Sequence, residues 1–240
     1  MSLVVKNLSG GYNGSKVLDS ISFNVDDGKI VALIGLNGAG KSTTINYLIG
    51  LLPIQTGNIE LNGQNIVSNS IEYKQQIAYI PETPILYQEL TLREHLEAII
   101  LAYKLDSKSA WDKAEQLLKT FRLEKQLDWF PTEFSKGMKQ KVMLVAALMT
   151  DAKLLIIDEP FLGLDPLAVD DLTDILEAKK REGVAILLTT HVVSVAEKFV
   201  DEFILLDKGK IRIQGTSVQV KKKFPKIKKL DDIYQQLANE

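Results

Sequence analysis

A glycine-rich loop near residue 40 carries the residue types that hold phosphate groups. Residues 35–43 read Gly-Leu-Asn-Gly-Ala-Gly-Lys-Ser-Thr, which fits the pattern G-x-x-x-x-G-K-S. Glycines let backbone N–H groups face a phosphate, and the start of a helix adds a favourable dipole. The spacing predicts that Lys41 reaches the β- and γ-phosphates of a nucleotide and that the Ser42 hydroxyl takes one Mg²⁺ position. The alternative is an ordinary glycine-rich turn.

The segments on both sides of this loop are those that a phosphate site needs. The apolar run 30–34 predicts a strand before the loop, and residues 41–52 predict a helix after it, which Pro53 ends. A strand, a glycine loop and a helix in this order favour a nucleotide site over a chance turn.

Two acidic residues follow another apolar run, 154–157. Ligands of open α/β sheets bind outside the carboxyl ends of the strands, where Asp158 and Glu159 stand. We expect Asp158 to hold Mg²⁺, directly or through water. Glu159 is expected to orient and deprotonate an attacking water, a role worth roughly 10²–10⁴-fold in rate. A solvated acidic turn is the alternative.

Hydrophobic patterning predicts an α/β fold with βαβ order. Apolar runs predict strands at 3–8, 17–25, 57–63, 77–80, 154–157, 185–188, 203–206 and 211–213. Helical spacing predicts helices within 91–150, at 168–181 and 194–200, and near 230–237. We therefore expect a nucleotide-binding core at 1–80 and 151–215, a helical insert at 81–150, and a basic C-terminal segment with an amphipathic helix at 216–240.

Composition excludes several classes of protein. The chain has 240 residues, 45% apolar and 25% charged, with a net charge of −2, so no overall basic field attracts nucleic acid. Its longest apolar run, 142–149, is far shorter than the roughly 20 residues of a membrane span. The N-terminus lacks the features of a signal peptide. The absence of cysteine excludes thiolate chemistry and fits the cytosol. We expect any work at a membrane to require a partner.

Taken in order along the chain, these motifs resemble the ATP-binding cassette (ABC) ATPases. The ordered set is 35–43, then 134–140 (Phe-Ser-Lys-Gly-Met-Lys-Gln), 154–159, 164–165 and His191. Residues 79–84 and 134–140 are most similar to the ABC-2-type exporter and Ecs-type transporter ATPases of Gram-positive bacteria. The resemblance implies a P-loop NTPase (RecA-like) core, an antiparallel β subdomain and an inserted α-helical subdomain.

The resemblance also implies roles for individual residues. Glu159, His191 and Lys41 would be catalytic, with His191 contacting the γ-phosphate, and Mg²⁺ would be held by Ser42, Asp158 and Glu82. Ser135 and Gly137 would complete the ATP site of a second cassette in a head-to-tail dimer, homo- or heteromeric. The residues implied to contact ATP are Tyr12, Gly35, Asn37, Gly38, Ala39, Gly40, Lys41, Ser42, Thr43, Ser135, Gly137 and Asp165.

Several of these positions have a second interpretation. Tyr12 either stacks on adenine or is a half-buried tyrosine at a turn. Asp165 contacts the second cassette, caps the helix that begins near Pro166, or does both. Glu82 stands where the family most often has glutamine, so it either binds Mg²⁺ or serves only as a hinge residue.

Other charged residues depart from the family pattern or stand outside it. Lys136 and Met138 replace the commoner glycine and glutamine of the signature. His95 is expected to be structural or on the surface. The six lysines within 221–229 form either a solvated face or a contact with anionic lipid.

The function that these features favour is an ATP-hydrolysing subunit on the cytoplasmic face of a bacterial cell membrane. It would power an integral membrane permease, as an exporter, through a docking groove within 82–94. The apolar residues of that groove, which include Leu86 and Tyr87, belong either to this docking site or to the core of the helical insert. The alternatives are a soluble ABC ATPase acting on nucleic acid or protein complexes, and an ATP-gated switch with poor turnover.

Overall fold

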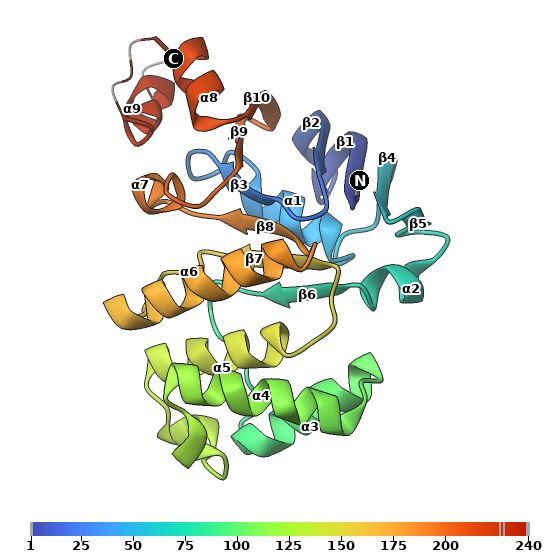
Figure 1. Cartoon of the computed structure of the whole chain (residues 1–240). Coiled ribbons are helices and arrows are strands. Elements are labelled where there is room, and N and C mark those ends of the chain that lie inside the picture. Colours follow the sequence, from blue (N-terminus) through green and yellow to red (C-terminus); the bar gives the residue numbers. More distant parts are fainter. Residues whose placement is uncertain (1, 226, 228, 239–240) are drawn as a thin grey trace.

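Two β-sheets form the centre of the molecule in a computed structural model that describes residues 2–225, 227 and 229–238 (Figure 1). The smaller sheet is antiparallel and has the order β2 (Ser15–Val25), β1 (Leu3–Tyr12), β4 (Thr56–Leu61), β5 (Gln64–Asn65). The larger sheet has the order β10 (Lys210–Gly215), β9 (Glu202–Asp207), β3 (Ile30–Ile34), β8 (Ala185–Thr189), β7 (Leu154–Asp158), β6 (Ile77–Ile80). Only the edge strand β10 runs antiparallel to its neighbour.

The larger sheet is buried on both faces because successive side chains of its strands enter two different cores. On β3, Ile30, Ala32 and Ile34 belong to one hydrophobic cluster, whereas Val31 and Leu33 belong to the other. The first cluster includes residues of the helical insert, and the second lies between the two sheets and the helix α1 (Lys41–Leu48). This arrangement explains why the strands appear as continuous apolar runs rather than alternating ones.

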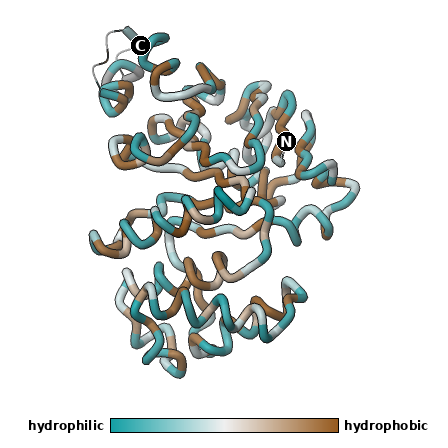
Figure 2. Tube along the Cα trace, viewed as in Figure 1, coloured by the Kyte–Doolittle hydropathy of each residue, from teal (hydrophilic) through white to brown (hydrophobic). Residues whose placement is uncertain are grey.

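The helical insert lies along the β6 edge of the larger sheet (Figure 1). Its helices are α3 (Leu92–Tyr103), α4 (Ser107–Phe121) and α5 (Lys136–Leu148), with 3₁₀ turns at Glu124–Gln126 and Pro131–Glu133. The helix α3 begins at a capping box in which Thr91 and Glu94 satisfy each other's backbone N–H. Figure 2 shows hydrophobic and hydrophilic residues alternating along these helices, which is the pattern of helices buried on one side.

The remaining helices connect or cover strands. They are α1 (Lys41–Leu48), α2 (Ser70–Lys74), α6 (Pro166–Arg181), α7 (Val193–Ala196), α8 (Ser217–Lys223) and α9 (Asp232–Ala238). The pattern of the sequence did not predict β5, α2 or α8.

Two predicted helices are too long. The helix after the glycine loop ends at Leu48 rather than at 52, because Gly50 takes a left-handed conformation with φ of 72°. The N–H groups of Gly50 and Leu51 then bond to the carbonyls of Tyr47 and Asn46, which is a Schellman motif. The helix predicted at 194–200 is a single turn, α7, and residues 197–199 after it form turns.

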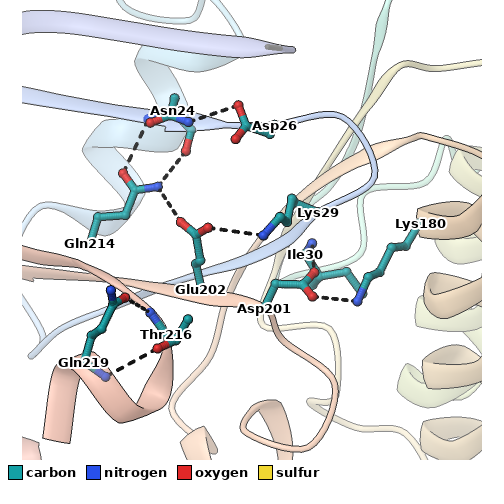
Figure 3. A network of polar contacts seen from close by, with 10 residues as sticks. All are labelled: Asn24, Asp26, Lys29, Ile30, Lys180, Asp201, Glu202, Gln214, Thr216 and Gln219. Carbon is teal, nitrogen blue, oxygen red and sulfur yellow. Dashed lines mark hydrogen bonds and ion pairs between the residues drawn. The ribbon is translucent and has the colours of Figure 1, made fainter.

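A polar network joins elements that are distant in sequence (Figure 3). Gln214 on β10 donates to the Asn24 carbonyl on β2 and to Glu202 on β9. Asp201 accepts hydrogen bonds from the Ile30 N–H on β3 and from Lys180 on α6. The network ties the smaller sheet and the C-terminal strand to the centre of the larger sheet.

The lysine-rich segment is partly engaged within the chain. Lys221 forms an ion pair with Glu197 at 2.6 Å, and Lys223 donates to the Arg212 carbonyl at 2.5 Å. Lys222 and Lys229 are exposed, while Lys226 and Lys228 lie outside the described residues. These contacts favour the solvated face over a dedicated lipid contact.

Candidate nucleotide site

The glycine loop joins the carboxyl end of β3 to the start of α1, in the middle of the larger sheet. Gly40 stands at the N-cap position of α1 with φ of 111°, and Gly38 has φ of 80°. A side chain at Gly40 would also approach Leu18 within 2.7 Å. Glycine is therefore required at this cap, and the first N–H groups of α1 are left free to bind an anion.

Residues from five segments line one hollow of about 460 Å³ at this edge of the sheet. They are Val17, Asn37, Gly38, Gly40, Lys41, Ser42, Thr43, Glu82, Asp158, Glu159 and His191. Of the predicted contacts to ATP, Gly35 lies in an adjoining hollow with His191, and Ala39 is buried beneath the loop. The structure thus brings together the predicted phosphate, metal and catalytic residues.

Lys41 is folded back onto the loop. Its Nζ donates to the carbonyls of Gly35 at 2.7 Å and Leu36 at 3.3 Å. Burial lowers the pKa of Lys41, while the negative charges of Glu159, Asp158 and Glu82 oppose that shift. An ammonium group with these neighbours can exchange two carbonyl partners for phosphate oxygens.

Thr189, at the end of β8, connects the two acidic residues. Its hydroxyl accepts a hydrogen bond from the Glu159 N–H at 3.0 Å and donates to a carboxylate oxygen of Asp158. Glu159 has a left-handed backbone with φ of 51°, which is uncommon for a residue with a side chain. The bond from Thr189 holds this conformation, so that Glu159 leaves the line of β7 and faces the hollow.

Glu159 and His191 face each other across the hollow. The His191 N–H donates to Glu159 Oε2 at 3.1 Å, and His191 Nε2 lies 3.2 Å from Oε1 without hydrogen-bond alignment. Oε1 is buried and accepts no hydrogen bond from the described residues. Burial raises the pKa of Glu159, and the backbone and ring of His191 oppose that shift. A buried carboxylate with one free oxygen can accept a proton from a water molecule.

The raised pKa of Glu159 predicts how stability depends on pH. A carboxyl group that binds its proton more tightly when folded stabilises the fold below its unfolded pKa, and this contribution is lost as pH rises through the folded pKa. We expect Glu159→Gln to raise the melting temperature at neutral pH, and the gain to shrink as pH falls toward about 4. Thermal unfolding of the full chain measures this.

Asp165→Asn is the matched control for that measurement. Lys141 holds the pKa of Asp165 below its usual value, so the same carboxyl-to-amide change is expected to lower the melting temperature at neutral pH. Equal effects of the two substitutions would contradict the assignment of the Glu159 shift to burial.

The oxygen donors around the hollow suit Mg²⁺. Ser42 supplies a hydroxyl, and Asp158 and Glu82 supply carboxylates, which are the hard ligands that this ion prefers. Among the described residues no cluster of three or more acidic, histidine or cysteine side chains could hold a metal ion. One or two protein ligands, completed by phosphate oxygens and water, are the usual arrangement for Mg²⁺.

Tyr12 lies at the end of β1, in a separate hollow next to the β1–β2 turn. Its ring is 41% exposed, and its hydroxyl accepts a hydrogen bond from Asn46 on α1 at 2.7 Å. Tyr12 is therefore anchored at its hydroxyl and partly exposed beside a turn, which agrees with both interpretations of this residue. Such a ring can stack on a base.

The signature segment lies at the start of α5, where Ser135 is the N-cap. Ser135 Oγ accepts from the Met138 N–H at 3.3 Å, and the Met138 side chain packs against the core of the insert. A side chain at Gly137 would approach the Gly163 carbonyl within 2.7 Å. Gly137 is therefore a point of close backbone contact between α5 and the loop that follows Glu159.

Asp165 is the N-cap residue of α6 and also forms an ion pair with α5. Its carboxylate accepts from the Ala168 N–H at 2.9 Å at the start of α6, and from Lys141 on α5 at 2.7 Å. The predicted cap is confirmed. Lys141, together with the contact between Gly137 and Gly163, ties the signature helix to the loop after β7.

Reasoning from the sequence missed two residues of this region. Thr189 was noted only as a neighbour of His191. Its position at the end of an apolar run could have indicated that it lies at the site. Tyr234 was assigned only to an amphipathic helix, although it lines the adjoining hollow with Gly35 and His191. His95 is buried in the insert, which confirms a structural role.

Comparison with known proteins agrees with this geometry. A family model described as "ABC transporter" matches residues 18–162. The ABC-type transporter ATP-binding protein EcsA of Bacillus subtilis (strain 168) is 49% identical over 242 residues, which cover 100% of this chain and 98% of EcsA. The SkfA peptide export ATP-binding protein SkfE of the same organism is 35% identical over 207 residues, 86% of each chain. A solved structure of an ATP binding subunit of an ABC transporter has a TM-score of 0.95 at 47% identity, covering 99% of this chain and 100% of that one.

The fold and the phosphate site define a P-loop nucleotide-hydrolysing enzyme of the cassette type. The chain belongs to the ABC transporter family and is an ATP-binding subunit that hydrolyses ATP. No helix within the described part of the chain is both long enough and apolar enough to span a bilayer.

Proposed function

We propose that this subunit drives export through a separate integral membrane permease, to which it is bound on the cytoplasmic side of a bacterial cell membrane. It would act as one of two cassettes that pair head to tail around Mg-ATP. The nucleotide-binding core would comprise 1–80 and 151–215, and the insert 81–150 would transmit the change in shape. The word "export" in the name of SkfE supports the direction.

The observation that carries the pairing is the composition of the phosphate hollow. Its lining comes from Val17 on β2, the glycine loop with the start of α1, the loop after β6, the end of β7 and residue 191. Ser135 and Gly137 stand at the start of α5, outside this set of lining residues. The N-terminus of their helix is an anion-binding end. Each cassette would therefore need a second one, whose own α5 N-terminus reaches the γ-phosphate in this hollow.

The residues in the hollow divide the work of hydrolysis. Lys41 and the loop N–H groups would hold the phosphates, and Ser42, Asp158 and Glu82 would hold Mg²⁺, which neutralises phosphate charge when bound. Glu159 would accept the proton of the attacking water through its free Oε1, and His191 would orient this carboxylate from the side of the γ-phosphate. Tyr12 would stack on adenine.

The docking site for the permease would lie at the loop after β6. Ile85 and Tyr87 are more than two-thirds exposed, at the edge of an apolar hollow that α3 and α5 also line. Leu86 instead packs against the core of the insert. The segment thus supplies both core and surface, and Tyr87 is the residue that we place at the interface.

Copurification tests this proposal. The full-length Glu159→Gln variant, expressed in the native host, is expected to retain Mg-ATP and to copurify with a multi-span membrane protein from detergent-solubilised membranes. Adding Tyr87→Glu is expected to reduce that recovery at least about tenfold, since a charge in an apolar contact costs more than 1.4 kcal/mol.

The competing functions give different results. Recovery only from the soluble fraction, with ribosomes or nucleic acid bound, would establish the soluble ABC ATPase instead. Turnover in the assembled complex that equals that of Glu159→Gln would establish the switch. A Tyr87→Glu chain that no longer folds would return Tyr87 to the core of the insert.

A further inference from the structure

The C-terminal segment holds the backbone on both sides of His191. Tyr234 on α9 donates a hydrogen bond from its hydroxyl to the Thr190 carbonyl at 3.1 Å. Asp231, just before α9, accepts one from the Ser194 N–H at 3.2 Å. His191 therefore lies between two backbone positions, Thr190 and Ser194, that the C-terminal segment holds by hydrogen bonds.

Packing anchors this contact. Leu230 and Ile233 are fully buried and belong to the same hydrophobic cluster as Val193 and Ala196. Figure 1 shows α9 at the end of the molecule that carries α7 and β9. Because the apolar residues position the helix, the hydroxyl of Tyr234 is available to orient a polar group.

Tyr234 also meets the glycine loop. Gly35, Leu36, Asn37, His191 and Tyr234 line one hollow of about 410 Å³. Burial raises the pKa of Tyr234, so the phenol keeps its proton and stays a donor at neutral pH. Tyr234 thus lies beside the phosphate loop, and its hydroxyl bonds the strand end that precedes His191.

We propose that Tyr234 is a positioning residue that aligns His191 with Glu159 and the phosphate loop. Because the Thr190 carbonyl and the His191 N–H belong to one planar peptide unit, holding the carbonyl also orients the N–H that donates to Glu159 Oε2. This inference rests on the proposed role of His191 at the γ-phosphate. It makes the C-terminal helix a part of the hydrolytic site, although this helix lies outside the segment that the family model matches.

The first test is turnover of the full chain with Mg-ATP. Tyr234→Phe removes one hydroxyl and keeps the packing of the ring, so kcat is expected to fall roughly threefold to tenfold while KM stays within about twofold. Tyr73→Phe is the matched control, because Tyr73 is also buried and donates to a backbone carbonyl, that of Leu48, at 2.9 Å. Tyr73→Phe is expected to keep the wild-type kcat.

The second test observes the histidine ring without nucleotide. The chain has only two histidines, so an untagged protein gives two imidazole signals by NMR. Tyr234→Phe and Asp231→Ala are each expected to move the signal of His191. The signal of His95 should stay in place, since its ring is held by the Tyr87 N–H and the Thr91 carbonyl.

These outcomes separate the inference from the function on which it rests. A His191 signal that stays at its wild-type position in Tyr234→Phe overturns the positioning role, whatever happens to kcat. A signal that moves with kcat unchanged supports the contact between Tyr234 and the histidine segment, and contradicts the role of His191 in hydrolysis.

Discussion

Replacing Glu159 with glutamine is expected to lower ATP turnover by roughly 10²–10⁴-fold, which is the usual contribution of a general base. The amide can still accept the His191 N–H that now bonds to Oε2, so the local backbone is retained. It cannot take a proton from water at the position of the buried Oε1. Steady-state phosphate release by the full chain measures kcat, and binding of a fluorescent ATP analogue verifies that the site still fills.

Glu182→Gln is the control for that substitution. Glu182 lies at the end of α6, where it pairs with Lys179 on the surface, so its loss is expected to leave kcat unchanged. If Glu159→Gln keeps more than about a tenth of wild-type turnover, Glu159 is not the base. The third interpretation, a switch with poor turnover, would then gain weight.

Replacing Lys41 with methionine is expected to weaken ATP binding about 10- to 100-fold. Hydrogen bonds to a charged group contribute roughly 1.5–3 kcal/mol, and each 1.4 kcal/mol is tenfold in affinity. Methionine has a similar length and no charge, and the pKa of Lys41 is already lowered by burial. The fold is therefore expected to be kept, and calorimetric titration with Mg-ATP gives the loss of affinity.

Lys113→Met serves as the comparison for Lys41→Met. Lys113 is a half-buried lysine of α4 that pairs with Asp151, far along the chain from the glycine loop. Its substitution should leave the affinity for Mg-ATP at the wild-type value. A loss of affinity in both variants would indicate a general effect of charge, and an unchanged affinity in Lys41→Met would remove Lys41 from the phosphate site.

The sequence by itself determined the parts of the site that are continuous in the chain. The loop 35–43 could be assigned because a buried strand, three glycines and a helix start follow one another without interruption. Asp158 and Glu159 could be assigned because they end an apolar run. Alternating strands and helices produce a parallel sheet, in which the carboxyl ends of the strands lie at one edge. The glycine loop and the two acidic residues follow such strand ends, so their proximity could be predicted.

Errors in the sequence-based prediction have local causes. The end of α1 was placed four residues late because Pro53 is a visible stop, whereas Gly50 ends the helix earlier by its left-handed backbone. The apolar residues of the segment 194–200 have helical spacing. They pack against the hydrophobic core, but the helix α7 ends at Ala196 and turns follow it.

Only the tertiary structure decided how the site residues are held. The Thr189 hydroxyl joins the Asp158 carboxylate to the Glu159 N–H, some thirty positions earlier in the chain. Gly137 meets the Gly163 backbone, and Tyr234 reaches the strand end before His191. Each of these contacts joins segments that are remote in sequence. The residue types alone do not encode them, because a hydroxyl or a glycine gains its role only when packing brings a specific partner within hydrogen-bond or van der Waals distance.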